Sequence, residues 1–291
     1  MKRYPAGSIG EILHAATDRL NQQGIDTARL DARVLMSHVL GKDPAWIIGH
    51  ADEPITEGVK QRFEALASRR EAYEPVAYLT GMREFWSLPF HVTPETLIPR
   101  PDTETLVAAA LEVFKDGPPA RILDLGTGCG CILLSLLSEW SEAQGTGVDI
   151  AKPSIAVAGI NAAALDMAER AEFFAGDWQL ALPADDAEYD LIVANPPYIS
   201  EPEMADLPAD VADFEPHRAL AAGADGLDAY RRMAPALAEL LRPGGFFLGE
   251  IGMKQADTAT AILADAGLTV MEIQADAAGR PRCVVARSPI P

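Results

Sequence analysis

Short apolar segments alternate with helical patterns from about residue 103 onward, and this alternation is the feature that most restricts the fold. Five strands are predicted at residues 121–125, 144–149, 171–175, 189–194 and 245–250, with helices at 131–140, 154–165, 227–241 and 258–266. Such alternation is typical of a mostly parallel sheet covered by helices on both faces. Two further strands, at 269–273 and 282–286, are too close together for a crossover and should be antiparallel neighbours. We therefore predict an α/β domain with a seven-stranded, mostly parallel sheet whose last strand is antiparallel.

The first 73 residues carry a different, helical pattern. Apolar residues recur at helical spacing on three predicted faces, which are Ile9, Ile12, Leu13, Ala16 and Leu20, then Leu30, Val34, Leu35 and Val39, then Val59, Phe63 and Leu66. The adjacent Arg69 and Arg70 are expected on the solvated helix surface. We predict a helical bundle at 1–73, a linker at 74–102 with hairpin strands at 84–88 and 91–93, and the α/β domain at 103–291.

Charge and composition disfavour several classes of protein. The net charge of −19 argues against a protein that holds duplex nucleic acid through its phosphates, because each such contact needs a cation. No segment has a signal-peptide pattern or the roughly 18 apolar residues of a membrane span, so we expect a cytoplasmic protein. Cys129, Cys131 and Cys283 match no zinc or redox spacing. They are expected to be reduced and buried, and no metal site is predicted.

The first strand of the α/β region runs into a glycine-rich segment, DLGTGCGC, at residues 124–131. Gly126, Gly128 and Gly130 allow a tight turn and a close ligand approach at the carboxyl end of a parallel strand. Asp149 ends the second strand, 19 residues after Gly130, near the offset of about 20 at which an acidic side chain binds a ribose diol. An adenosine-type ligand is predicted, and this offset leaves open whether it is NAD or S-adenosylmethionine.

The spacing of the glycines favours S-adenosylmethionine. A dinucleotide fingerprint is GxGxxG, whereas this loop is GxGxG and has the acidic Asp124 two positions before it. The loop resembles motif I of S-adenosylmethionine-dependent methyltransferases, which implies cofactor contacts by Gly126, Thr127, Gly128, Cys129 and Gly130. After the third strand, Asp177 and Trp178 are expected to hold the adenine by hydrogen bonding and stacking.

The fourth strand runs into Asn195, Pro196, Pro197 and Tyr198, which should face the glycine loop across the ligand cleft. The nitrogen lone pair of an amide or exocyclic amine is delocalised, so a catalyst must hold both N–H bonds where rehybridisation exposes that pair. The Asn195 side-chain carbonyl can accept one hydrogen bond and the Pro196 backbone carbonyl the other, with proline fixing its direction. The Tyr198 ring is expected to stack on the target plane and to favour a sulfonium cation nearby. The motif predicts methylation of a planar nitrogen, and it resembles the motif of nitrogen methyltransferases that act on adenine in nucleic acid or on glutamine in protein.

Several further segments resemble the release factor glutamine methyltransferase family, also called HemK or PrmC: EPVAYLTGMREFW at 74–86, IPRPDTE at 98–104, FEPHRAL at 214–220, DGL at 225–227 and EIG at 250–252. The resemblance implies a Rossmann-like class I methyltransferase that uses S-adenosylmethionine to methylate N5 of the glutamine in the Gly-Gly-Gln motif of peptide chain release factors. It also implies that Arg100 and Glu104 lie by the cofactor site. Because a Gly-Gly-Gln loop offers few side chains, the helical bundle is expected to recognise the protein substrate. A monomer without direct nucleic-acid contacts is expected.

One position and one short segment depart from the family pattern, and three other functions compete with the one it implies. Cys129 stands where serine or threonine is usual, and residues 253–255 replace a segment that is often aromatic and acidic. An adenine-N6 methyltransferase would share the Asn-Pro-Pro-Tyr motif but needs a basic groove, which the charge of −19 disfavours. A cofactor-binding scaffold would be expected to lose Asn195 or the glycines. An NAD oxidoreductase lacks a residue set that clearly positions a hydride donor.

Overall fold

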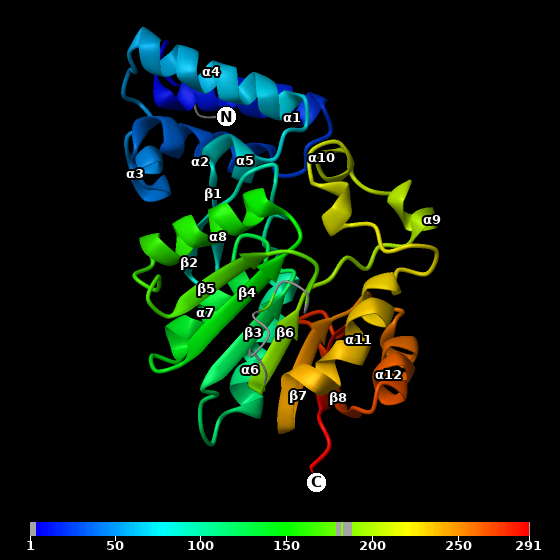
Figure 1. Ribbon diagram of the computed structural model, residues 1–291. Coiled ribbons are helices and arrows are strands. Elements are labelled where there is room, and N and C mark those ends of the chain that lie inside the picture. The colour runs from blue at the N-terminus through cyan, green and yellow to red at the C-terminus, as the bar shows by residue number, and fades with distance from the viewer. Residues whose placement is uncertain (1–3, 179–181, 183–187, 291) are drawn as a thin grey trace. The chain divides into compact units, whose positions relative to one another are not determined.

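A computed structural model describes residues 4–178, 182 and 188–290 of the 291-residue chain. Contacts divide the chain into two compact units (Figure 1). The smaller comprises Met1–Gly81 with Ala209–Phe214, and the larger comprises Met82–Pro208 with Glu215–Pro291. The segment predicted as a linker, 74–102, is therefore shared between the units, with the division after Gly81. Within the described ranges, no helix is long and apolar enough to cross a membrane.

The larger unit is built on a seven-stranded sheet with the order β5-β4-β3-β6-β7-β9-β8. Its strands are β3 (Arg121–Leu125), β4 (Gln144–Asp149), β5 (Ala171–Ala175), β6 (Tyr189–Ala194), β7 (Leu241–Glu250), β8 (Thr269–Ala275) and β9 (Pro281–Arg287). Strands β3 to β7 pair in parallel, whereas β9 is antiparallel to both β7 and β8. The predicted seven-stranded, mostly parallel sheet with an antiparallel last strand is confirmed.

Helices cover this sheet, and they are α6 (Glu104–Val113), α7 (Cys131–Glu139), α8 (Lys152–Ala164), α11 (Asp228–Leu240) and α12 (Ala256–Asp265). Short helical turns lie in the connections: η1 (Pro101–Thr103), α9 (Glu201–Met204) and η3 (His217–Ala219). A core cluster joins the sheet to α11 and α12 through side chains such as Ile192, Phe247, Met233 and Leu263. All six residues of β6 are buried, as expected of a central strand covered on both faces.

The predicted hairpin of the larger unit exists, but its predicted boundaries are wrong. Its strands are β1 (Met82–Phe85) and β2 (Leu88–His91), which pair so that Phe85 faces Leu88. The turn residues Trp86 and Ser87 have φ values of 52° and 61°. This left-handed region is usually taken by Asn or Gly in two-residue hairpin turns, so a Trp-Ser turn carries no recognisable sequence signal.

Strand β7 also begins earlier than predicted, at Leu241 instead of residue 245. Leu241 pairs with Tyr189, and the register then shifts before Phe246 pairs with Leu191. A β-carbon on Gly245 would lie 2.9 Å from the Tyr189 carbonyl oxygen, so the shifted segment needs a residue without a side chain there. The Arg-Pro-Gly-Gly sequence looks like a turn, although here it forms an irregularity within the strand.

The smaller unit is helical, with α1 (Ile9–Gln22), α2 (Ala28–Leu40), α3 (Pro44–Gly49), α4 (Glu57–Glu71), α5 (Val76–Thr80) and α10 (Ala209–Ala212). Its core contains Ile9, Ile12, Ala16, Leu20, Ala32, Leu35, Met36, Ile47, Phe63 and Ala67. Two predictions in this unit, the burial of Leu30 and the exposure of Arg70, are wrong.

Leu30 was predicted to lie on a buried helix face, but it is 61% exposed. The buried face of α2 is formed by Ala32, Leu35 and Met36 instead.

Arg70 is buried and is not part of the solvated helix surface. Its Nε donates to Asp31 Oδ2 at 2.8 Å, and its Nη1 donates to the Tyr73 carbonyl at 3.0 Å. Asp31 also accepts a hydrogen bond from Thr27 Oγ1 at 2.9 Å. A buried charge is tolerated when it is paired in this way, and the partner on α2 is not visible in the local sequence around Arg70.

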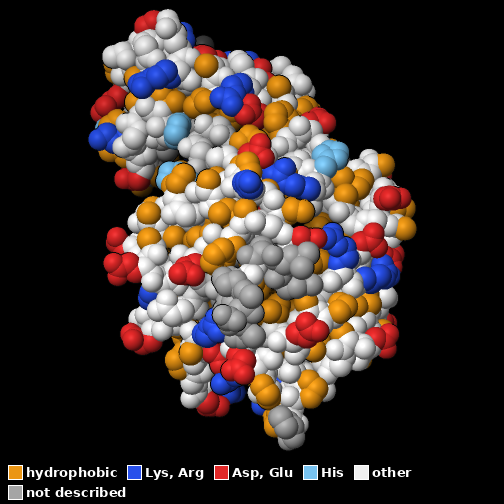
Figure 2. Space-filling view, viewed as in Figure 1, with side chains coloured by type: hydrophobic (Ala, Val, Ile, Leu, Met, Phe, Trp, Pro, Cys, Tyr) orange, Lys and Arg blue, Asp and Glu red, His pale blue; other side chains and the backbone are white. Residues whose placement is uncertain are grey.

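Acidic and basic side chains are mixed on the face of the larger unit seen in Figure 2. Arg231 and Arg232 lie on the exposed surface of α11. Arg231 pairs with Asp225, with an Nη2–Oδ2 distance of 2.5 Å, and Arg232 pairs with Asp177. These arginines are therefore already neutralised by neighbouring carboxylates.

Candidate active site

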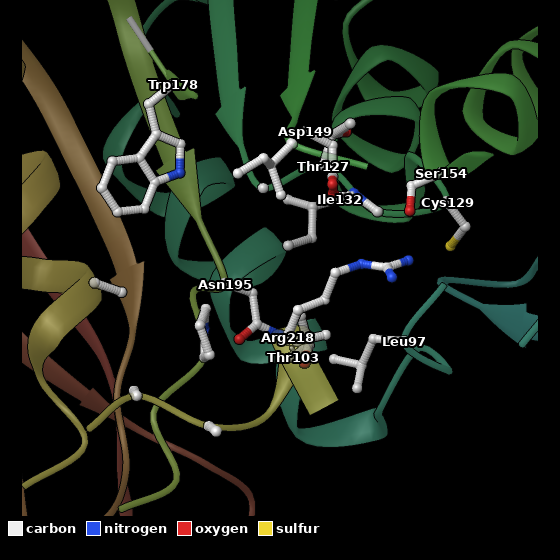
Figure 3. Close-up of a pocket in the computed structure, with 18 of the residues that line it drawn as sticks. Leu97, Thr103, Thr127, Cys129, Ile132, Asp149, Ser154, Trp178, Asn195 and Arg218 are labelled. Carbon is white, nitrogen blue, oxygen red and sulfur yellow. Dashed lines mark hydrogen bonds between the residues drawn. The ribbon is translucent and has the colours of Figure 1, made fainter. Parts of the chain in front are cut away.

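A cavity of about 390 Å³ opens at the carboxyl ends of β3, β4 and β6, the edge where parallel sheets bind ligands. Its walls include the glycine loop after β3, Asp149 at the end of β4, Trp178 after β5 and Asn195 after β6. Figure 3 shows Asp149, Trp178 and Asn195 around this space. A cavity of this size falls in the range of about 300–1,000 Å³ that is common for small-molecule sites. The structure thus brings the glycine loop, Asp149, Trp178 and Asn195 together at one cavity.

The first part of the glycine loop, from Gly126 to Cys129, lines the cavity, whereas Gly130 is buried and is not a cavity-lining residue of the described chain. Gly126, Gly128 and Gly130 have φ values of 80°, 57° and 83°, the region that favours glycine. A β-carbon at Gly126 would meet nothing within 4 Å, and one at Gly128 would meet only the Gly126 carbonyl oxygen at 4.0 Å. The open space beside these two glycines is therefore free for a ligand. Thr127 and Cys129 also line the cavity.

Asp149 braces the glycine loop. Its Oδ2 accepts a hydrogen bond from the Gly128 amide at 2.9 Å, and its Oδ1 accepts one from the Ala151 amide at 2.8 Å. Burial raises the pKa of the Asp149 carboxyl, while these two amides and the nearby Arg218 guanidinium oppose the shift. Each carboxylate oxygen has a second lone pair, so Asp149 can accept further hydrogen bonds from a ligand.

Trp178 and Asp177 line the cavity together with Arg232. The Arg232 guanidinium carbon lies 4.8 Å from the centroid of the Trp178 ring, and its Nη2 donates to the two Asp177 oxygens at 2.9 and 2.7 Å. Trp178 has a φ of 42°. Arg232 therefore covers one face of the Trp178 indole and pairs with the Asp177 carboxylate. The predicted roles of Trp178 and Asp177 in holding the adenine stay predictions.

The Asn-Pro-Pro-Tyr residues are divided between the cavity and the protein behind it. Asn195 and Pro197 line the cavity, and Pro196 is buried. The Asn195 Nδ2 donates to Thr103 Oγ1 at 3.2 Å. Tyr198 is not among the cavity-lining residues of the described chain, and its hydroxyl accepts a hydrogen bond from Arg282 Nη1 at 3.5 Å. Burial raises the pKa of the Tyr198 phenol above its usual range.

Gln255 holds the Asn-Pro-Pro-Tyr loop from behind, a role that no sequence motif indicates. Its Nε2 donates to the carbonyl oxygens of Tyr198 at 2.9 Å, of Asp225 at 3.2 Å and of Gly226 at 3.2 Å. A β-carbon on Gly226 would lie 2.3 Å from the Tyr198 carbonyl oxygen. The Asp-Gly-Leu segment thus needs its glycine for close approach to the loop.

Arg100 and Glu104, both implied to lie by the cofactor site, have different surroundings. Arg100 lines the cavity and forms an ion pair with Glu215, whose side chain is almost fully buried. Glu215 Oε2 also accepts a hydrogen bond from the Ile98 amide at 3.1 Å. Glu104 is not a cavity-lining residue of the described chain; its Oε1 accepts a hydrogen bond from the Trp86 amide at 2.9 Å and so holds the hairpin turn.

Asp124, at the end of β3, is fully buried, and burial raises its pKa to about 7 from 3.8. Its Oδ2 accepts a hydrogen bond from Thr127 Oγ1 at 2.7 Å. Between about pH 4 and 7 the folded protein keeps a proton on Asp124 that the unfolded chain has released. The protonated carboxyl therefore makes a contribution to the free energy of unfolding that is fully present below about pH 4 and is lost as the pH rises through about 7.

We therefore expect the free energy of unfolding of the native protein, relative to Asp124→Asn, to rise by about 1 kcal/mol per pH unit between pH 7 and pH 5. The measurement is urea unfolding of both proteins at several pH values. Parallel curves for the two proteins would contradict the raised pKa of Asp124.

Comparison with known proteins adds the deciding observation. A family model described as the PrmC N-terminal domain matches residues 11–81, and one described as the methyltransferase small domain matches residues 103–209. A release factor glutamine methyltransferase of Rhodospirillum rubrum is 45% identical over 96% of this chain and 85% of that protein. One of Cereibacter sphaeroides is 45% identical over 96% of this chain and 98% of that protein. The chain belongs to the release factor glutamine methyltransferase family.

The fold of this family member is also shared with solved structures. A methyltransferase from Pyrococcus furiosus has a TM-score of 0.52 and 14% identity, over 78% of this chain and 98% of that one. Likeness at this identity concerns the fold alone. The predicted family, the class I methyltransferase fold and the assignment as a methyltransferase are confirmed.

Proposed function

We propose that this family member transfers a methyl group from S-adenosylmethionine to the side-chain amide nitrogen N5 of the glutamine in the Gly-Gly-Gln motif of peptide chain release factors. The names of its relatives support this substrate. The observation that carries the proposal is the orientation of the Asn195 amide at the cavity wall. Its Nδ2 is bound to Thr103, which leaves Oδ1 as an acceptor for a substrate N–H.

The cavity residues fit the proposed cofactor. Asp149 keeps lone pairs for a ribose diol, and the open space beside Gly126 and Gly128 leaves room for a ligand against the backbone. Trp178 and Asp177 are proposed to hold the adenine once Arg232 makes room for it. When bound, the cofactor supplies an electrophilic methyl group on a sulfonium centre. Thr127, Cys129 and Gly130 complete the proposed contacts of the loop.

The chain's own residues would then present the amide. Asn195 Oδ1 and the Pro196 carbonyl are proposed to accept the two amide hydrogens, so that the nitrogen lone pair faces the methyl group. The rings of Pro196 and Pro197 restrict the backbone and fix these directions. Tyr198 is proposed to stack at the substrate plane. This arrangement contributes positioning and electrostatic stabilisation, and it needs no strong base because the nitrogen becomes acidic only after methylation.

The rival function is methylation of adenine N6 in nucleic acid, which would use the same Asn-Pro-Pro-Tyr residues. The net charge of −19 and the pairing of surface arginines with carboxylates favour a protein substrate.

The deciding experiment supplies labelled S-adenosylmethionine with intact release factor, with its Gln→Ala variant and with adenine-containing DNA. We expect label only on the intact release factor. Label on DNA, or on the Gln→Ala variant, would refute the proposal.

The helical bundle, predicted at 1–73, is proposed to recognise the body of the release factor. We expect its deletion to lower kcat/KM on intact release factor by at least about tenfold, because the substrate loop alone offers few side chains for recognition. A short Gly-Gly-Gln peptide is the control substrate, since its slow methylation should persist and would show that the catalytic unit still folds. Unchanged rates on intact release factor would contradict this role.

We also propose that the enzyme acts in the cytoplasm as a monomer. Its proposed substrates are translation factors, and the predicted site lies within one chain. Light scattering after size-exclusion chromatography would test the monomer, and cell fractionation would test the location. A stable dimer or a membrane-bound pool would contradict these points.

A further inference from the structure

Arg218 is a cationic side chain on the wall of the cavity, and neither the glycine loop nor the Asn-Pro-Pro-Tyr motif includes it. It belongs to the short helical turn η3 and lines the cavity. Figure 3 shows Trp178 at one end of this space and the Arg218 guanidinium at the other, with Asp149 and Asn195 between them. Arg218 thus lies at the end that is farther from the residue proposed to hold the adenine.

One nitrogen of the Arg218 guanidinium is fixed to the cavity wall. Its Nη2 donates to the Glu95 carbonyl oxygen at 2.8 Å and to Glu95 Oε2 at 2.9 Å. The same Glu95 carbonyl oxygen accepts a hydrogen bond from Ser154 Oγ at 3.0 Å, and Ser154 is buried on α8. Because the backbone carbonyl is itself held by a buried side chain, the guanidinium has a defined position at the wall.

The remaining N–H groups of Arg218 are open to a ligand. A guanidinium has five N–H donors, and the two on Nη2 are directed at Glu95. Within the described part of the chain, the donors on Nε and Nη1 have no hydrogen-bond partner. The side chain is 44% exposed, so there is space beside it. A planar group of free donors fits the two oxygens of a carboxylate.

The other charges at the cavity leave Arg218 as the cation that an anionic ligand group can use. Of the two other arginines that line the described cavity, Arg232 lies at the adenine end, and Arg100 is paired with the buried Glu215. The partner of Arg218, Glu95, is 51% exposed, so water screens this pair. An anionic group needs a cation here because four carboxylates line the cavity, those of Glu95, Asp149, Asp177 and Asp228.

We propose that Arg218 binds the carboxylate of the methionine part of S-adenosylmethionine. This inference rests on the proposed function. Adenine, ribose and methionine follow one another along the cofactor, so a molecule with its adenine at Trp178 and its ribose at Asp149 extends its methionine toward Arg218 (Figure 3). Asn195, the residue proposed to hold the substrate amide, lies between the two ends, as transfer from the central sulfonium requires.

The test measures binding of two ligands to Arg218→Met, which removes the charge and keeps an unbranched side chain. We expect the Kd for S-adenosylhomocysteine, measured by calorimetry, to rise by about tenfold or more, because charge-assisted hydrogen bonds to its carboxylate are lost. The second ligand is S-adenosylhomocysteine whose carboxylate is replaced by hydrogen. Its Kd should be the same for the native protein and for Arg218→Met. Equal losses for both ligands would show a disturbed cavity and overturn the inference.

Arg231→Met is the matched control, because it also removes one positive charge. Arg231 is exposed on α11, is paired with Asp225 and is not a cavity-lining residue of the described chain. Its Kd for each ligand should stay within about twofold of the native value. A native Kd for S-adenosylhomocysteine in Arg218→Met would overturn the inference and leave the proposed function standing. If the native protein does not bind S-adenosylhomocysteine at all, the proposed cofactor is refuted and the inference falls with it.

Discussion

The Asn195→Ala variant is expected to bind S-adenosylmethionine as the native enzyme does and to lose most of its turnover. We expect kcat to fall by about 10²–10³-fold, the loss typical when one preorganised hydrogen-bonding group is removed from a reacting centre. The Asn195 Oδ1 is the group proposed to hold a substrate N–H, and its direction is set by the Nδ2–Thr103 hydrogen bond of 3.2 Å. Single-turnover methylation of intact release factor measures the effect, with the cofactor Kd determined on the same sample.

A matched control for this variant is Asn21→Ala, which removes an exposed asparagine amide from α1 of the smaller unit. It should leave both kcat and the cofactor Kd unchanged. Retained methyl transfer by Asn195→Ala would refute the proposed mechanism. A loss of cofactor binding in parallel with turnover would instead assign Asn195 to the cofactor side of the cavity.

The catalytic fold could be predicted from the sequence because its signals are local. Buried parallel strands such as β6 appear as continuous apolar runs, and the helices between them show their own period. The errors arise where a tertiary contact overrides local preference. The Trp86-Ser87 turn adopts left-handed φ values without a glycine, and Arg70 is buried because Asp31 on another helix neutralises it.

The front of the site could also be predicted, since Gly126, Asp149 and Asn195 each stand in a short motif at a strand end. The groups behind it could not be predicted in this way. The Asn195–Thr103 bond spans 92 residues, and the bond from Gln255 to the Tyr198 carbonyl spans 57. Nothing in the neighbouring sequence specifies such pairs, because they form only when segments far apart in the sequence meet in the fold.

Tyr198 illustrates the limit of reading a motif by its residue types. The ring was predicted to stack on the substrate, yet in this structure the hydroxyl is bound behind the loop, near Arg282 and Glu250. A buried phenol needs such a partner, and only the fold reveals which one it finds. The stacking role therefore depends on how the ring face meets a substrate, whereas the hydroxyl contributes to holding the loop.

Asp149→Ala is expected to raise the Kd for S-adenosylmethionine by about 100-fold, because hydrogen bonds to a charged group contribute about 1.5–3 kcal/mol each. The proposed ribose contacts are lost, and the amides of Gly128 and Ala151 lose the acceptors that they have at 2.9 and 2.8 Å. At saturating cofactor, kcat should fall much less, since the groups that hold the substrate amide are untouched. Calorimetry with S-adenosylhomocysteine, the proposed product, measures the affinity.

Two further variants separate the causes of this loss. Asp149→Asn keeps one carbonyl acceptor for a loop amide but lacks the charge, so its Kd should lie between those of the native enzyme and Asp149→Ala. Asp265→Ala removes an exposed carboxylate at the end of α12 and should bind as the native enzyme does. A native Kd in Asp149→Ala would exclude a ribose contact at this position. It would also mean that the glycine loop keeps its conformation without the Asp149 hydrogen bonds, because a changed loop conformation would itself weaken cofactor binding.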